Sequence, residues 1–270
     1  MFPRMEWTDD GIVLATRPYG EASVVASLLT ERHGRHAGLV RGATGPRNRG
    51  TLQVGNRVQA RWWARLNDHL GALTCELSAA VAGPLLDNPE RLAALAAACA
   101  VAEASLPERE PAPRVYRGLV ILLSDLCNGD RWPTTFVRWE VALLANLGFG
   151  LDLSRCAVTG RTDGLSFVSP RTGRAVSVDA AWPYRDRLLT LPAFLIEPGL
   201  IGETKDVLRG LQLTEFFLAR HVFEPAGKTV PAARQRLAAL IARRTAGTSG
   251  EAAPVDAPAD AGTAPARSAS

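Results

Sequence analysis

The residues best suited to chemistry in this chain are arginines gathered near its N-terminus. Eight of them lie between Arg32 and Arg65, and this stretch contains no aspartate or glutamate. Guanidinium groups neutralise phosphates and release counterions, and the rings of Trp62 and Trp63 offer bases a stacking surface. The pattern favours a nucleic-acid surface over an ordinary solvated face, although arginine also far outnumbers lysine in the whole chain.

The arginines lie on segments that alternate polar and apolar residues, which is the pattern of β-strands. Two such segments, 35–41 and 57–65, flank a stretch rich in glycine at 42–51. We predict that this stretch is an exposed loop that packs neither as a strand nor as a helix. Because neighbouring strand residues point to opposite faces, we expect at least one of Trp62 and Trp63 to lie in the core.

From these residues we predict a set of DNA contacts. Trp62 or Trp63 is the candidate for stacking on bases, and roughly half of the candidate arginines should face the nucleic acid because strand neighbours alternate. The candidate phosphate contacts are Arg35, Arg41, Arg47, Arg49, Arg61 and Arg65.

The segments around this run predict a small all-β domain over residues 1–82. Five short strands are expected at 11–17, 22–31, 35–41, 57–66 and 71–77. Closing so few strands into a barrel removes the exposed edges, and the OB-fold is the five-stranded barrel that commonly binds oligonucleotides.

The pattern becomes helical after Gly83 and Pro84, which predicts a helical domain over residues 83–244. Asn88 is the expected N-cap of its first helix, with Pro89 in the first turn. An irregular insertion with hairpin-like pieces is expected at about 149–183, and a disordered tail at 245–270. Further helices are predicted at 115–129, 133–148 with Gly148 as the stop, 185–196, 203–223 and 231–244.

Motifs for catalysis are absent from the sequence. It contains no Walker A element, no GxGxxG, no HExxH and no GxSxG. Its acidic residues do not have a spacing that establishes a two-metal nuclease site. We therefore predict that the protein is not an enzyme and holds no cofactor.

The histidines and cysteines do not predict a metal site either. His33 and His36 are expected on opposite faces of a strand, where they extend the polar surface, and no second ligand pair follows them. No two cysteines form a CxxC pair, so we predict neither a disulfide framework nor a zinc knuckle. The expected state is free, buried thiols in a reducing cytoplasm for Cys75, Cys99, Cys127 and Cys156.

The composition of the chain limits the classes of protein to which it can belong. The 270 residues are 47% hydrophobic, which is ample for real cores, and the net charge of +4 is modest, so the basic character is local. No signal-peptide core and no uninterrupted apolar stretch of about 18 residues is present. We expect a soluble, cytoplasmic protein without a membrane partner.

The order of these parts resembles the RecO family of bacterial DNA repair proteins. The resemblance runs from about Trp7 to Arg243, and its most specific pieces are GRHAGLVRGA at 34–43, GFGLDLSRCAVTG at 148–160 and PYRDRLLTLPAFL at 183–195. It implies an α+β fold with an N-terminal OB-fold barrel and a helical domain that carries a zinc-finger-like insertion.

The resemblance also implies a function and partners. Such proteins are recombination mediators that bind single- and double-stranded DNA, anneal complementary strands and act at the nucleoid. They contact the C-terminal tail of single-stranded DNA-binding protein (SSB), and with RecR they load the recombinase RecA.

One departure from the family concerns zinc. Many relatives carry a four-cysteine zinc site that begins at the position of Cys156, but here Thr159 stands where the next ligand is expected. We therefore predict no metal, and an insertion held by hydrogen bonds and by a small apolar cluster of Leu151, Leu153, Leu165, Phe167 and Val168.

Three other functions stay open from the sequence. The first is a general single-stranded nucleic-acid-binding OB protein with a separate helical protein-interaction module. A metal-dependent nuclease would degrade DNA in the presence of Mg²⁺. A protein scaffold whose arginine face meets an acidic partner would not bind DNA at all.

Overall fold

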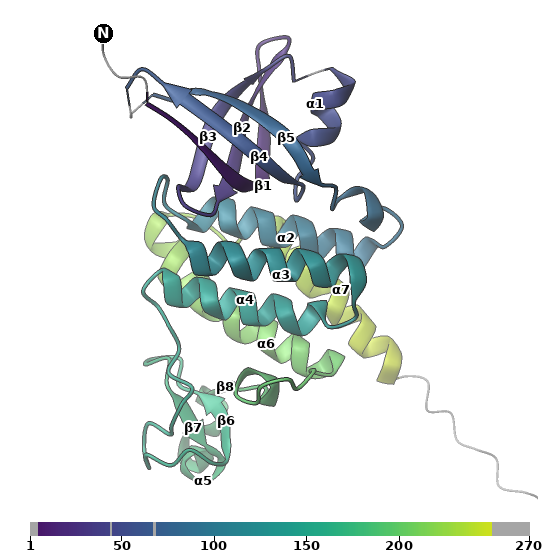
Figure 1. The fold of residues 1–270 in the computed structure, drawn as a ribbon. Coiled ribbons are helices and arrows are strands. Elements are labelled where there is room, and N and C mark those ends of the chain that lie inside the picture. The colour runs from purple at the N-terminus through teal and green to yellow at the C-terminus, as the bar shows by residue number, and fades with distance from the viewer. Residues whose placement is uncertain (1–4, 44, 67–68, 250–270) are drawn as a thin grey trace, which may run out of the picture.

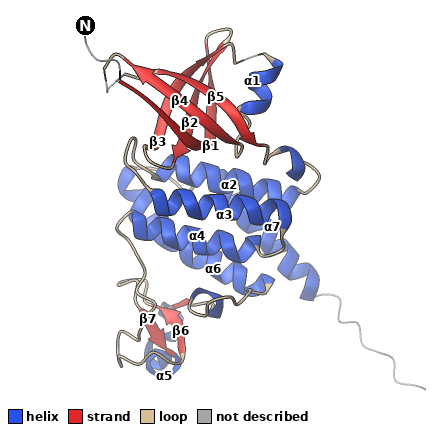
Figure 2. Ribbon diagram, in the orientation of Figure 1, coloured by secondary structure: helices blue, strands red, loops and turns tan. Residues whose placement is uncertain are grey.

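The structure is a computed structural model that describes residues 5–43, 45–66 and 69–249. A barrel of strands stands on one side of a set of packed helices, and a small insertion projects from the opposite side (Figure 1). The sequence therefore folds as α+β, with strands first and helices after them (Figure 2).

Five strands form a closed barrel in the order β1-β2-β3-β5-β4. Neighbouring strands are antiparallel except β3 and β5, which run parallel and meet at a single bridge between Leu39 and Ala72. The barrel is therefore least tightly closed between β3 and β5. The strands are β1 (Met5–Tyr19), β2 (Ser23–Thr30), β3 (Gly34–Arg41), β4 (Arg57–Ala64) and β5 (Ala72–Ala79).

Side-chain alternation fills the barrel and attaches it to the helices. Val13 of β1 lies inside the barrel with alternate residues of β3 and β4, including Val40 and Trp62. Ile12 and Leu14 point the other way and pack into the helical core. One strand thus serves two cores, which is what a period of two allows.

The predicted loop at 42–51 is wrong, because Pro46–Thr51 forms a short helix, α1. Pro46 has a backbone angle already suited to a first helical turn, and the N–H of Leu52 donates to the carbonyl of Asn48 at 2.9 Å. Thr51 and Leu52 are buried, Leu52 against the barrel core. Burial of these side chains outweighs the poor helix propensity of the glycines.

The helical part begins as predicted. The side chain of Asn88 accepts a hydrogen bond from the N–H of Arg91 at 3.1 Å and caps α2, while Gly148 has a φ of +88° just after α4. A short 3-10 turn (Gly83–Leu85) precedes α2, and a π-helical turn (Ala219–Phe223) and a 3-10 turn (Glu224–Ala226) follow α6. The main helices are α2 (Pro89–Ser105), α3 (Pro113–Asn128), α4 (Trp132–Asn146), α6 (Thr204–Leu218) and α7 (Ala232–Ser249).

Two predictions for this part need correction. Residues 185–196 do not form a helix, because Leu189 pairs with a strand of the insertion and Pro192 disfavours helical geometry in the residue before it. This segment consists of 3-10 turns at Trp182–Arg187 and Ala193–Leu195 on either side of β8 (Leu189–Thr190). In addition, α7 continues past Thr245, where the tail was expected to begin, and residues 250–270 lie outside the described part.

The insertion contains the predicted hairpin. β6 (Leu165–Val168) pairs with β7 (Ala175–Ser177), β8 joins the other edge of β6, and α5 (Val178–Ala181) follows β7. Leu165 and Val168 are buried, and Leu151, Leu153 and Phe167 are partly buried. The expected apolar cluster exists, but it is continuous with the core of the helices rather than separate from it.

A buried ion pair ties three helices together. Glu140 of α4 and Arg234 of α7 are both fully buried, with Nε of Arg234 2.6 Å from Oε1 of Glu140. Nη2 of Arg234 also donates to the carbonyl of Leu211 at 2.8 Å, and the hydroxyl of Thr214 donates to Glu140.

None of the helices in the described part is long and apolar enough to span a membrane.

Candidate nucleic-acid interface

The strands of the barrel send the candidate arginines in different directions. Nε of Arg35 donates to the carbonyl of Leu106 at 2.8 Å, and its guanidinium also lies 3.6 Å from Glu103 and 3.5 Å from Glu108. Arg35 therefore faces the helical part and connects the barrel to it, and it is not placed to contact a phosphate. Arg61 is exposed, but its guanidinium is already paired with Glu6 from β1.

Other candidate arginines are exposed on the outside of the barrel. Arg41 at the end of β3, Arg49 in α1 and Arg65 just after β4 are all exposed. Arg47 has its backbone in α1, while its side chain lies outside the described part of the chain. With Arg61, four of the candidate arginines are therefore exposed on the outside of the barrel.

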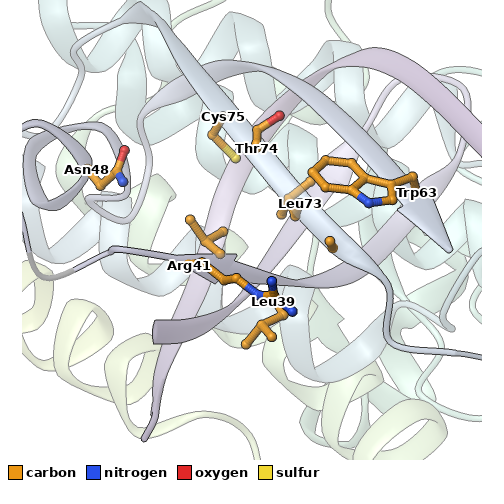
Figure 3. A pocket seen from close by; sticks show the side chains of 9 residues that line it. Leu39, Arg41, Asn48, Trp63, Leu73, Thr74 and Cys75 are labelled. Atoms are coloured by element: carbon orange, nitrogen blue, oxygen red, sulfur yellow. The ribbon is translucent and has the colours of Figure 1, made fainter. Parts of the chain in front are cut away.

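A groove opens where β3 and β5 diverge beyond their single bridge (Figure 3). Its volume is about 220 Å³, and Leu73 and Val40 form its apolar floor. Trp63 of β4 and Arg41 of β3 both line it, with Asn48 from α1 at one end. An aromatic ring and a guanidinium group around one apolar groove can hold an unpaired base together with its phosphate.

The two tryptophans of β4 have different roles. Trp62 is 1% exposed, and its indole N–H donates to the carbonyl of Leu70 at 2.9 Å. A base cannot reach either face of that ring, which goes against the choice of Trp62 for stacking. Trp63 is half-buried and lines the groove, so it is the stacking candidate that the geometry supports.

The histidines do not extend the polar surface as expected. His33 stacks on Trp7 with a ring-centre distance of 4.3 Å, and His36 is buried between Trp7 and Trp62 at 5.0 and 4.7 Å. Both rings contact the same tryptophan because His33 lies in the turn before β3, where strand alternation does not apply. Burial lowers the pKa of His36 to about 4.

Asp9 anchors this aromatic group at the barrel end. It accepts hydrogen bonds from the backbone N–H of Arg32 at 2.8 Å and from the side chains of His33 and Arg32 at 2.9 and 3.1 Å. Burial raises the pKa of Asp9, but these hydrogen bonds outweigh it and leave the pKa below its usual value. Arg32 is therefore also committed to a carboxylate.

Cys156 takes part in a compact hydrogen-bonded turn of the insertion. Its Sγ accepts hydrogen bonds from the N–H and hydroxyl of Ser177 at 3.3 and 3.4 Å and from the N–H of Thr159 at 3.5 Å. No group of three or more histidine, cysteine or acidic side chains that could hold a metal occurs among the residues that the structure describes.

Several positions that decide the interface gave no clear signal in the sequence. The groove depends on the divergence of β3 and β5, which are far apart in the chain, and on Asn48 in a helix that composition argued against. The role of Arg35 depends on a carbonyl 71 residues away. The alternation of Trp62 and Trp63 was the one useful signal, since it required one of them to be in the core.

Comparisons with known proteins bear on the chain as a whole. Residues 5–80 match the family model "Recombination protein O N terminal", and residues 86–229 match "Recombination protein O C terminal". The DNA repair protein RecO of Rhodospirillum rubrum is 53% identical over 248 residues, which cover 90% of this chain and 98% of that protein. The RecO proteins of Rhodospirillum centenum and Granulibacter bethesdensis are 53% and 49% identical, over 86% and 89% of this chain and 93% and 97% of theirs.

Proposed function

Because the chain belongs to the recombination protein O family of DNA repair proteins, we propose that its barrel binds single- and double-stranded DNA and anneals complementary strands during recombination. The observation that supports this most is the groove between β3 and β5, where Arg41 and Trp63 lie beside one apolar floor. Exposed Arg49 and Arg65 extend the basic surface around it.

We assign the barrel to the OB-fold. Its strand order, β1-β2-β3-β5-β4, and its weak parallel closure between β3 and β5 agree with a five-stranded, partly open Greek-key barrel. Barrels of this kind bind oligonucleotides on an open strand face. The groove is lined by residues of β3, β4 and β5, with Arg41 at the end of β3, while Arg49 lies in α1 and Arg65 just after β4.

Annealing follows from the physical character of this surface. Two DNA strands repel each other as polyanions, and exposed arginines neutralise phosphates without fixing the edges of the bases. A strand held in this way keeps its bases free for pairing with a complement. The proposed role is that of a mediator, so the protein makes and breaks no covalent bond.

The proposed role includes partner proteins. We expect RecR and the C-terminal tail of SSB to bind this chain, and RecA to be loaded indirectly through them. Binding an acidic tail calls for an apolar surface with arginines nearby, and the helical part carries exposed arginines on several helices. These partners distinguish a mediator from a general single-stranded nucleic-acid-binding protein.

DNA binding across a salt series tests the barrel surface. For a single strand, each lost phosphate contact should reduce the slope of log affinity against log salt by about 0.7. The triple variant Arg41→Ala/Arg49→Ala/Arg65→Ala should therefore lose roughly two units of slope and anneal strands more slowly. The control Arg114→Ala/Arg236→Ala/Arg243→Ala removes as many exposed arginines from α3 and α7 and should keep the slope.

The outcomes separate the candidate functions. Equal slopes in the two triple variants would move the DNA site away from the barrel. Binding without annealing would favour the general nucleic-acid-binding protein, and loss of labelled DNA with Mg²⁺ would favour a nuclease. If the wild-type chain does not bind DNA, the arginine surface is a protein-docking face.

A further inference from the structure

The insertion exposes two large rings that are separated by one residue in the chain. Trp182 is 80% exposed and Tyr184 is 59% exposed, and both belong to the 3-10 turn that follows α5. Trp182 is the most exposed large apolar side chain in the part of the protein that the structure describes. A patch of neighbouring large exposed apolar side chains marks a candidate interaction site.

Arginines that form no ion pair with any carboxylate of the described residues accompany these rings. Arg185 and Arg187 belong to the same turn, and the guanidinium of Arg185 lies 5.9 Å from the ring centre of Phe167 in β6. Arg155 and Arg171 are also exposed. Among the described residues, no carboxylate oxygen lies within 4.0 Å of any of these four arginines.

The charge balance of the insertion favours an anionic partner. Residues 149–190 contain six arginines, four aspartates and no lysine or glutamate, which gives a net charge of +2. Asp152 and Asp163 are paired with Arg174 and Arg161. Four arginines that have no ion pair within the described part of the chain are then balanced by only two aspartates of the insertion, Asp179 and Asp186.

We propose that Trp182, Tyr184, Arg185 and Arg187, here called the insertion tip, form a second contact for single-stranded nucleic acid. Unpaired bases can stack on the rings while the guanidinium groups contact phosphates. A duplex hides the faces of its bases, so the tip selects single strands. The tip and the barrel lie on opposite sides of the helices, so one chain can hold two strands or two separate parts of one strand (Figure 1).

The rings are tested in the full chain carrying Arg41→Ala/Arg49→Ala/Arg65→Ala, which weakens the barrel surface. Adding Trp182→Ala/Tyr184→Ala should lower the affinity for oligothymidylate of about 20 nucleotides by about tenfold or more, and leave duplex binding unchanged. Val158→Ser/Val178→Ser removes exposed apolar side chains from the same insertion and should leave both affinities unchanged. If the ring variant binds oligothymidylate as its parent does, the proposal fails.

The arginines are tested with a matched change of charge. Arg185→Glu/Arg187→Glu should weaken oligothymidylate binding and reduce its salt slope by about 1.4, while Lys205→Glu/Lys228→Glu alters net charge equally outside the insertion and should keep the slope. Equal losses in the two variants would overturn the proposal. So would a ring variant that changes only the self-association of the chain, seen by sedimentation, because the tip would then bind a second copy.

The proposal for the insertion tip and the proposal for the barrel can be refuted independently of each other. If the barrel triple variant keeps the wild-type salt slope but the tip variants reduce it, the tip stands and the barrel proposal fails. The reverse result leaves the barrel and removes the tip.

Discussion

The two adjacent tryptophans of β4 show how one residue position decides between stability and binding. Trp62 fills the barrel, where its ring stacks against Trp7 at 5.8 Å and meets His36 edge-on. Trp63 points to the groove between β3 and β5. The same type of side chain therefore stabilises the barrel core at position 62 and lines the candidate binding groove at position 63.

Replacing each tryptophan by alanine should separate these roles. Trp62→Ala leaves a large cavity in the barrel and should lower the free energy of unfolding by about 3–5 kcal/mol. Trp63→Ala should change stability much less, but weaken single-stranded DNA binding by about 1–3 kcal/mol. Urea unfolding and titration with labelled oligonucleotides measure the two effects. A Trp63→Ala protein with unchanged affinity would rule out stacking in the groove.

His36 makes the stability of the barrel depend on pH. Burial lowers its pKa from 6.5 to about 4, so between these values the unfolded chain binds a proton that the folded chain does not. The stability is fully present above pH 6.5 and falls as the pH drops to about 4, by up to about 3 kcal/mol. Asp9, whose pKa is also lowered, adds a loss in the same direction below pH 3.8.

Urea unfolding between pH 7 and pH 4 measures this effect. His36→Phe keeps a ring between Trp7 and Trp62 but removes the titrating group, so its stability should fall less over the same range. An equal fall in the wild-type and variant chains would show that other groups cause the pH dependence.

At the scale of elements, the insertion is organised around Cys156. Hydrogen bonds from Ser177 and Thr159 hold the end of β7 and the turn at residues 157–159 against its sulfur, and the backbone N–H of Ala157 donates to the carbonyl of Ala175 at 2.8 Å. Burial raises the pKa of Cys156, but the hydrogen bonds outweigh it and lower the pKa to about 6. The thiolate form is thus favoured by donors from the protein itself.

We therefore expect the insertion to be stable without zinc. Between residues 149 and 190 the sequence offers Cys156 as the single cysteine and no histidine, so four thiolate or imidazole ligands are not available there. A chelator should leave the thermal unfolding of the chain unchanged, and metal analysis of the purified protein should find zinc far below one equivalent. A stoichiometric metal whose removal lowers the melting temperature would contradict this.

The sequence predicts elements best where the signal is local. Alternation identified the five strands, and Asn88 and Gly148 marked helix ends through their own capping geometry. The helix at 46–51 and the non-helical segment at 185–196 were missed because burial and strand pairing with distant residues decide them. The same holds for the interface. The sequence shows which residue types are present, but it does not show that Arg35 and Arg61 are paired with residues far away in the chain.

At the scale of the whole molecule, the joint between the barrel and the helices contains buried hydrogen bonds to backbone groups. The N–H of Arg109 donates to the carbonyl of Arg35 at 2.7 Å, and the side chain of buried Asn56 accepts from the N–H groups of Val81 and Ala82 at 2.9 and 3.3 Å. Buried hydrogen bonds of this kind are costly to break. The joint therefore holds the groove in a fixed orientation relative to the helices.

Gly34 is the residue on which this joint can be tested. Its φ is +67°, and a Cβ there would overlap the backbone carbonyl of Glu110, whereas Gly42 has a φ of +64° with open space around it. Both alanine substitutions cost about 1–2 kcal/mol for the left-handed backbone, but only Gly34→Ala must also push the 106–112 segment away from the barrel. Calorimetry should show one unfolding transition for the wild-type chain and for Gly42→Ala, and two for Gly34→Ala. Matching transitions in the two variants would mean that the contact at Gly34 does not couple the barrel to the helices.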